Sequence, residues 1–259
     1  IIIKITAPII GKLLIFDTPA ILDIIILIGI LSITVVKIPS IPDDNPTIKV
    51  FDVSSFNAYA GTSFIIPDSV LEIKDSVFKD CKNLKDIVIN DNITMIPSYA
   101  FSGCSSLEKI IIPKNVNTIG RYAFSNCSAE IVWNTSSLTH IDSYGFSDYK
   151  GHSFEIPNTV EFCGTAAFRN CIFLEEFTIP TAIKDIPYGM FSGCTSLTKV
   201  TFHEDIKSIG ANVFSNCTSL ETIHFYGNEN PLYCSNSAFE GIERDKIVVY
   251  VSSENKNDE

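Results

Sequence analysis

The chain has 259 residues, 46% of them apolar and 19% charged, which is enough apolar material to bury a large core and excludes intrinsic disorder for the chain as a whole. Its 30 acidic and 19 basic residues give a net charge of −11, which argues against nucleic acid and anionic membrane surfaces as partners. Of the first fifty residues 17 are Ile, and this asymmetry divides the chain into two unlike parts.

Residues 1–49 form an irregular, Ile-rich segment with no clear copy of the repeat that follows. Its most apolar stretch, 24–36, has 13 residues without a charge, whereas a membrane-spanning helix needs about 20. Three interpretations stay open: degenerate solenoid coils or a cap, a membrane or signal anchor, and a segment that is not naturally part of the fold. Membrane association is expected only if the segment is an anchor. Pro39, Pro42 and Pro46 indicate a turn or linker before the repeats.

Residues 50–251 repeat at intervals of 22 or 23 residues, with 25 at the last step. A Phe marks every repeat: Phe56, Phe78, Phe101, Phe124, Phe146, Phe168, Phe191, Phe214 and Phe239. Three residues after the Phe, six repeats carry Cys: Cys81, Cys104, Cys127, Cys171, Cys194 and Cys217. Five residues before it stands Ile in most repeats, and Cys163 or Cys234 in two. A polar acidic tail, 252–259, follows the last repeat.

Five repeats also contain a group of the form Leu-x-x-Ile-x-Ile, with Val or Phe at some of the Ile positions. Leu107, Ile110 and Ile112 are an example, and the period of two is typical of a strand with one buried face. The residues before each Phe suit a single helical or 3₁₀ turn. A unit of about 23 residues cannot bury its apolar edge alone, whereas stacked units can. The sequence therefore predicts a β-rich solenoid of about nine repeats, each with one short strand and one short helical or 3₁₀ turn.

The pattern Ile-Pro-x-x-Val-x-x-Ile-x-x-x-Ala-Phe-x-x-Cys-x-x-Leu resembles the BspA-like class of leucine-rich repeats, best at 112–127 and 183–220. Two repeats depart from it, with Ser-Ala-Glu at 128–130 in place of the expected Leu, and with Tyr149 in place of Cys. The resemblance implies a leucine-rich repeat solenoid that is non-catalytic, exposed at the cell surface, protein-binding and often adhesive, as in bacteria and parasitic protists.

No pattern in the sequence indicates catalysis, a cofactor or a metal site. All eight Cys occupy positions where the repeat uses apolar side chains, so buried free thiols are expected, and no Cys-x-x-Cys pair suggests zinc. The four His are scattered, and Gly-x-Ser-x-Gly and phosphate-loop motifs are absent. Four Asn-x-Ser/Thr sequons, at Asn92, Asn126, Asn134 and Asn216, are compatible with secretion.

The candidate binding surface is the outward side of the strands, because side chains alternate between the two faces of a strand. Eight strands would align these residues in two columns, with Ser153 and Glu155 in the fifth strand. An aliphatic run in the early half and acidic neighbours would attract an apolar, basic partner, although β-branched residues also suit strands without any partner. The candidate residues are Ile65, Val88, Lys109, Ile111, Glu130, Val132, Glu155, Glu176, Thr178, Lys199, Thr201 and His224.

Two functions from different classes remain. The first is a cell-surface or extracellular adhesion module that binds a protein or glycoprotein, including host or matrix components. The second is a structural spacer or intracellular scaffold without a dedicated ligand, and buried thiols are compatible with a cytoplasmic location as well. The family resemblance favours the first.

Overall fold

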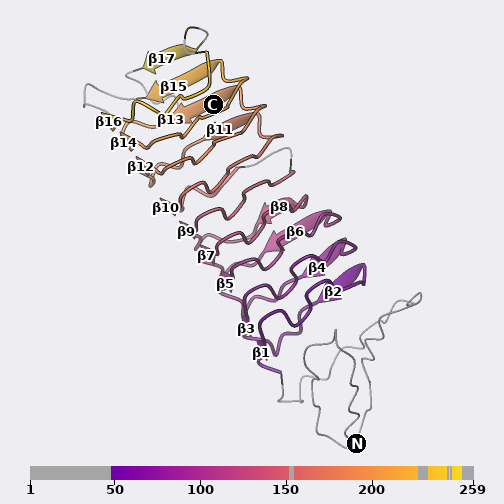
Figure 1. Ribbon diagram of the computed structural model, residues 1–259. Coiled ribbons are helices and arrows are strands. Elements are labelled where there is room, and N and C mark those ends of the chain that lie inside the picture. Colours follow the sequence, from indigo (N-terminus) through magenta and orange to yellow (C-terminus); the bar gives the residue numbers. More distant parts are fainter. Residues whose placement is uncertain (1–47, 152–154, 227–232, 244, 246, 253–259) are drawn as a thin grey trace, which may run out of the picture.

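The computed structural model describes residues 48–151, 155–226, 233–243, 245 and 247–252. They form a parallel β-solenoid of about eight turns, which confirms the expected fold class. The segment 1–49 lies outside the described residues except for its last two. Two sets of strands follow the long axis, one on each side of the coil (Figure 1).

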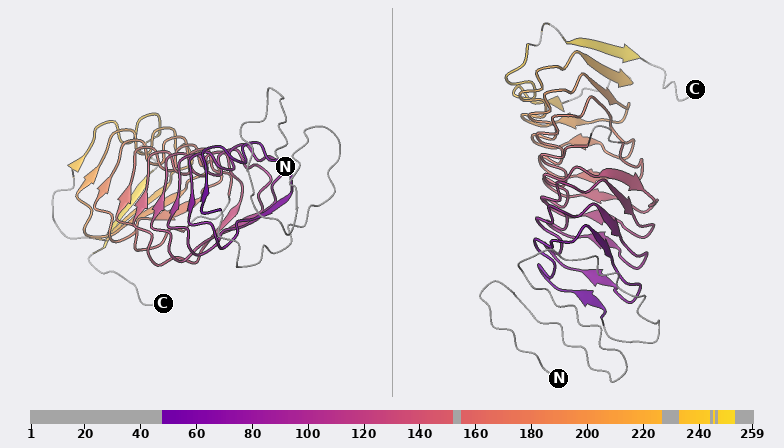
Figure 2. Two further views of the ribbon diagram at one scale, coloured as in Figure 1. Left: turned by 90° about the horizontal axis from the view of Figure 1, so that it is seen from below. Right: turned by 90° about the vertical axis from the view of Figure 1, so that its right-hand side faces the viewer.

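The longer strands, of three to five residues, form one side, and their outward surface is called the strand face. They are β2 (Ser63–Ile65), β4 (Asp86–Val88), β6 (Lys109–Ile112), β8 (Glu130–Trp133), β11 (Glu176–Thr178), β13 (Lys199–Phe202), β15 (Thr222–Tyr226) and β17 (Val248–Ser252). They pair in the orders β2-β4-β6-β8 and β11-β13-β15-β17. Figure 2 shows the strands of both sheets on the same side of the stack.

A second set of two-residue strands forms the short ladder, which the sequence analysis did not anticipate. Each strand contains the position five residues before a repeat Phe. The set comprises β1 (Val50–Phe51), β3 (Glu72–Ile73), β5 (Met95–Ile96), β7 (Thr118–Ile119), β9 (His140–Ile141), β10 (Phe162–Cys163), β12 (Asp185–Ile186), β14 (Ser208–Ile209) and β16 (Tyr233–Cys234).

The core is organised around the column of repeat Phe rings. Neighbouring rings are stacked at every step from Phe56 to Phe239, with centroids 5.1–5.9 Å apart. Because each central ring contacts the coils before and after it, the column buries the apolar edge that a single repeat cannot cover. The Ile, Val and Leu columns surround it, and nearly all of them are fully buried.

The segments around each Phe, called the turn face, are chains of turns rather than the expected helical turn. From Phe56 to Phe214, the residues two before and two after each Phe adopt positive φ, as at Tyr99 (58°) and Gly103 (76°). This alternation directs every second N–H along the solenoid axis, so that Tyr99, Phe101 and Gly103 donate to carbonyls of the next coil at 2.8–2.9 Å. Hydrogen bonds between coils therefore continue on this side without a strand or helix.

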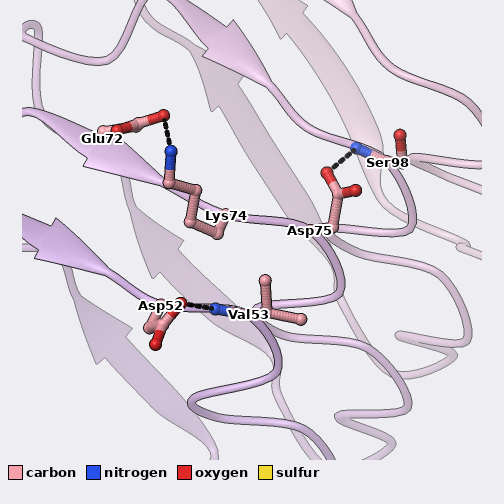
Figure 3. Close-up of polar contacts among 6 residues, drawn as sticks. All are labelled: Asp52, Val53, Glu72, Lys74, Asp75 and Ser98. Atoms are coloured by element: carbon pink, nitrogen blue, oxygen red, sulfur yellow. Dashed lines mark hydrogen bonds and ion pairs between the residues drawn. The ribbon is translucent and has the colours of Figure 1, made fainter.

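Two prolines interrupt the short ladder, which divides into β1-β3, β5-β7-β9-β10 and β12-β14-β16. In the other coils, the residue after the two-residue strand donates its N–H to the coil before, as Gly120 does to Ile96 O at 2.7 Å. Pro97 and Pro187 occupy this position after β5 and β12 and have no N–H to donate. At the first break the Asp75 side chain accepts from the Ser98 N–H at 3.2 Å instead, beside the Glu72–Lys74 ion pair (Figure 3).

Candidate functional site

The early half of the strand face carries an exposed aliphatic column from β2 to β8. Strand pairing places Ile65 beside Val88 and Ile111 beside Val132 in neighbouring strands. Ile65 is 60% exposed, Val88 56% and Ile111 51%, whereas Val132 is half-buried. Alternate residues of the same strands, such as Phe64 and Ile110, point into the core and are buried. The column is a contiguous apolar strip that the core does not use.

Charged side chains form a second, parallel column on the strand face. Lys109 lies beside Glu130 in the next strand, 4.0 Å apart, and Lys199 lies 3.3 Å from Glu176. All four side chains are substantially exposed, so each pair adds little to stability. Lys109 and Glu130 border the strip and make its margin polar, whereas Lys199 and Glu176 belong to the later half of the strand face.

The later half of the strand face is polar and aromatic. Thr178 in β11 is exposed, and Thr201 in β13 and His224 in β15 are half-buried. The His224 ring lies 4.8 Å from the ring of Tyr250 in β17. The candidate residues of this half are therefore aligned by strand pairing, but they do not extend the aliphatic column.

Among the described residues the strand face consists of two four-stranded sheets, and the fifth strand expected from the sequence falls mostly on residues outside them. Residues 152–154, including Ser153, lie outside the described part of the chain, and Glu155 is not in a strand. Trp133, at the end of β8, extends from the first half toward this coil, and its Nε1 donates to the Glu155 carbonyl at 2.6 Å. The main chain of Glu155 therefore contacts the end of β8, and strand pairing does not align its side chain with the other candidate residues.

The cysteine column is part of the core, with one exception. Cys81, Cys104, Cys171, Cys194 and Cys217 each donate their S–H to the Phe carbonyl of the preceding coil at 3.1–3.2 Å. Burial raises the pKa of Cys127 to about 12. The expectation that all eight thiols are buried is wrong for Cys234, which is exposed because it lies in the last strand of the short ladder.

A tyrosine stack on the turn face was missed in the sequence. Tyr99, Tyr122 and Tyr144 stand two residues before successive Phe, and their rings stack with centroids 5.0 and 4.7 Å apart. The Arg121 guanidinium lies 5.3 Å from the Tyr122 ring centroid and 5.7 Å from that of Tyr144. Because all three Tyr occupy the same position in the repeat, the sequence could have predicted that their rings stack. The half-buried rings contact one another, so the stack is explained by packing between coils.

The remaining features of the described part of the chain concern metal binding, cavities and membrane spans. No group of three or more His, Cys, Asp or Glu there could hold a metal ion. A cavity of about 370 Å³ lies at the second break of the short ladder and is lined by Glu161, Phe162, Cys163, Ala182, Lys184, Asp185 and Pro187. Within the same described residues, no helix is long and apolar enough to cross a membrane.

Comparison with known proteins identifies the repeat. Residues 32–151 and 139–255 match the family described as BspA type leucine-rich repeat region, in six copies. The match begins inside the segment 1–49. No curated protein matches the chain.

Three solved structures are similar to the chain, and the first of them shows the same fold. A leucine-rich repeat protein from Eubacterium ventriosum is 24% identical with a TM-score of 0.51, and the alignment covers 76% of this chain and 62% of that one. A leucine-rich cell surface protein from Faecalibacterium prausnitzii is 24% identical over 75% of this chain and 60% of its own, with a TM-score of 0.44. A T. pallidum leucine-rich repeat protein is 27% identical over 70% and 75%, with a TM-score of 0.45. The chain spans about three-fifths of the length of the first two.

Proposed function

The chain belongs to the BspA-type leucine-rich repeat family, and we propose that it is a non-catalytic module that binds a protein or glycoprotein through its strand face. The observation that carries the proposal is the exposed aliphatic column of Ile65, Val88 and Ile111. Backbone hydrogen bonds of β4 and β6 are satisfied by the strands on either side, so the fold does not require large apolar side chains on their outward surface. Contact with a partner would remove these apolar side chains from water.

The chemistry of the strand face also indicates the kind of partner. An apolar strip with charged margins resembles the arrangement of protein interfaces, in which an apolar centre is surrounded by a polar rim. The chain's net charge of −11 favours approach by a basic protein surface at low ionic strength. Glu130 is an exposed carboxylate beside the strip, and Glu176 is one in the later half of the same face.

We further propose that the module acts at the cell surface or outside the cell, as an adhesion or recognition protein for host or matrix components. Besides the family, support comes from the four sequon asparagines, Asn92, Asn126, Asn134 and Asn216, all of which are exposed. Labelling intact cells with a membrane-impermeant reagent tests this location. Labelling only after lysis would contradict it.

The binding proposal is tested by selecting peptides from a display library on the immobilised chain. The test variant is Ile65→Glu with Ile111→Glu, which places charge on the strip in two strands that are not neighbours. The matched control is Leu71→Glu with Met95→Glu, because these residues are 51% and 42% exposed on the side of the short ladder. Selected peptides should lose at least about tenfold in affinity for the test variant, about 1.4 kcal/mol, and bind the control normally.

Both variants should melt near the parent temperature, because exposed substitutions usually change stability by less than about 0.5 kcal/mol. Peptides that bind the test variant and the parent equally would place binding on another face. A selection that yields no peptide bound to the strand face would contradict the proposal that the chain is a binding module.

A further inference from the structure

The two central strands of the aliphatic strip carry charges whose sign reverses from one coil to the next. Residues 83–91, around β4, and residues 106–114, around β6, occupy equivalent places in successive coils. The first set contains Lys85, Asp86 and Asp91, and the second contains Glu108, Lys109 and Lys114 in the same order. Each charge is thus opposite in sign to the one 23 residues later, and the six charges sum to zero.

Ion pairs between the two coils account for the charges at both ends of these strands. Lys85 lies 3.6 Å from Glu108 just before the strands begin. Lys114 lies 3.1 Å from Asp91 at the turn that follows them. All four side chains are more than half exposed, so each pair alone adds little to stability. Along the chain, the two pairs therefore precede and follow the strip.

Asp86, on the strand face itself, differs from these residues. Strand register places it beside Lys109, but the Lys109 ammonium lies 4.0 Å from Glu130 on its other side. No ion pair joins Asp86 to another of the described residues. Its side chain is exposed and stands two residues before Val88 of the strip. A cation from outside the chain can therefore approach this carboxylate beside the strip.

We propose that the strip binds the strip of a second copy of this chain, about a twofold axis that runs parallel to the strands and midway between β4 and β6. The inference rests on the proposed function, because it names a partner for the same surface. Rotation about this axis keeps the direction of the strands and inverts the order of the coils. The coil of β4 then faces the coil of β6 of the second copy, with the two sheets about 10 Å apart.

The inverted order of the coils brings apolar side chains together. Val88 faces Ile111 of the second copy, and Ile65 faces Val132 of the second copy. Ile65, Val88 and Ile111 are each more than half exposed in the single chain, so their burial supplies the attraction. An unrelated partner would have to present apolar groups at the spacing of the coils, whereas a second copy has this spacing already.

The same rotation places each charge of the two coils opposite a charge of the other sign. Asp86 faces Lys109 of the second copy and gains the counter-ion that it lacks in the single chain. The pair of Lys85 and Glu108 meets its own inverted copy, so that four charges alternate in sign, and the pair at the far end of the strands does likewise. A twofold axis along the solenoid would instead place Lys109 opposite Lys109 and Asp86 opposite Asp86.

The size of the surface indicates a weak dimer. Four strands and the residues from Lys85 to Asp91 cover about 20 by 20 Å, or about 400 Å² on each copy, which is about half of a standard interface. Beyond this neutral patch the net charge of −11 on each chain opposes association, and salt screens that repulsion. The dimer should dissociate on dilution, which leaves the strip available to another partner.

The test reverses one charge at a time in the full chain. Lys109→Glu places a carboxylate opposite Asp86 twice in each dimer, and Asp86→Lys places two ammonium groups opposite Lys109. Sedimentation velocity between about 10 and about 500 µM in about 150 mM salt should show a dimer for the parent, and each variant should raise its dissociation constant roughly tenfold or more. An equimolar mixture of the two variants should form the dimer again, because every facing pair then has opposite signs.

The matched control is Lys199→Glu. Lys199 lies 3.3 Å from Glu176 in the later half of the strand face, so this change also reverses the charge of one exposed ion pair. Its dimer should equal that of the parent. A parent that stays monomeric over the whole range, a Lys109→Glu dimer as strong as the parent's, a mixture that stays monomeric, or an equal loss in Lys199→Glu overturns the proposal.

The double variant Ile65→Glu with Ile111→Glu separates this inference from the proposed function. It should lose both the dimer and the selected peptides. If the parent is monomeric while peptides still bind the strip and lose affinity for the double variant, only the dimer is refuted. If the parent forms the dimer with the expected charge dependence but selects no peptide on the strand face, the dimer stands and binding of a foreign protein is contradicted.

Discussion

Removing one ring from the middle of the Phe column should divide the solenoid into two folding units. Phe146 is fully buried and stacks on Phe124 at 5.1 Å and on Phe168 at 5.7 Å. Truncating a buried Phe to Ala costs about 3–5 kcal/mol, and each stacked pair is worth about 0.5–1.5 kcal/mol beyond its buried area. Because two stacks are lost, we expect Phe146→Ala to cost about 5 kcal/mol, the upper end of that range.

The effect should not spread evenly, because coils of a solenoid are stabilised mainly by their immediate neighbours. The weakened interface lies between the coils of Phe124 and Phe168, so urea should unfold the two halves in separate transitions. Far-UV circular dichroism reports both halves. Trp133, the single Trp of the chain, lies 6.3 Å from Phe146 and reports the site itself through its fluorescence.

The matched control is Phe56→Ala in the first described coil. Phe56 is partly buried and has a repeat Phe on one side only, at 5.3 Å. Its loss should cost less and leave a single transition. If Phe146→Ala unfolds in one step at the urea midpoint of the parent, nearest-neighbour coupling through the Phe column is refuted.

Two other predictions follow from the core. Ellman titration of the native protein should modify one thiol quickly, Cys234, and the other seven only after denaturation, because they are buried; fast reaction of several native thiols would contradict the cysteine column. Gly164→Ala should destabilise the fold by about 1–3 kcal/mol, because an added Cβ would lie 2.3 Å from the Ser143 main-chain nitrogen; a melting temperature equal to that of the parent would show that the coils separate there without cost.

The periodic part of the fold was predictable because its constraint repeats. Each coil must place a large ring in the same position, so Phe recurs, and the small site beside it accepts Cys that can also donate to a carbonyl. The outward direction of Ile65, Val88 and Ile111 followed from the alternation of a strand alone. These features depend on spacing along the chain, and spacing is visible in a sequence.

Features that depend on one coil's relation to the next were not predicted. Pro97 and Pro187 occupy the position after a two-residue strand, where the N–H of other coils donates to the coil before. The sequence does not show that these prolines interrupt the short ladder, because the ladder itself was not predicted. Likewise Cys234 has the sequence context of a core residue, and its exposure follows from its place in the last strand.

The strand face and the tyrosine stack differ in what packing alone explains. Tyr99, Tyr122 and Tyr144 contact one another, so each ring stabilises its neighbours and needs no partner. Ile65 and Ile111 project from strands whose backbone bonds and inward side chains already hold the coil, and more than half of each side chain remains in water. A Thr would satisfy the strand as well, as Thr178 and Thr201 do in the later half. The proposed contact with a partner would explain why this half carries aliphatic residues at outward positions where the later half carries Thr.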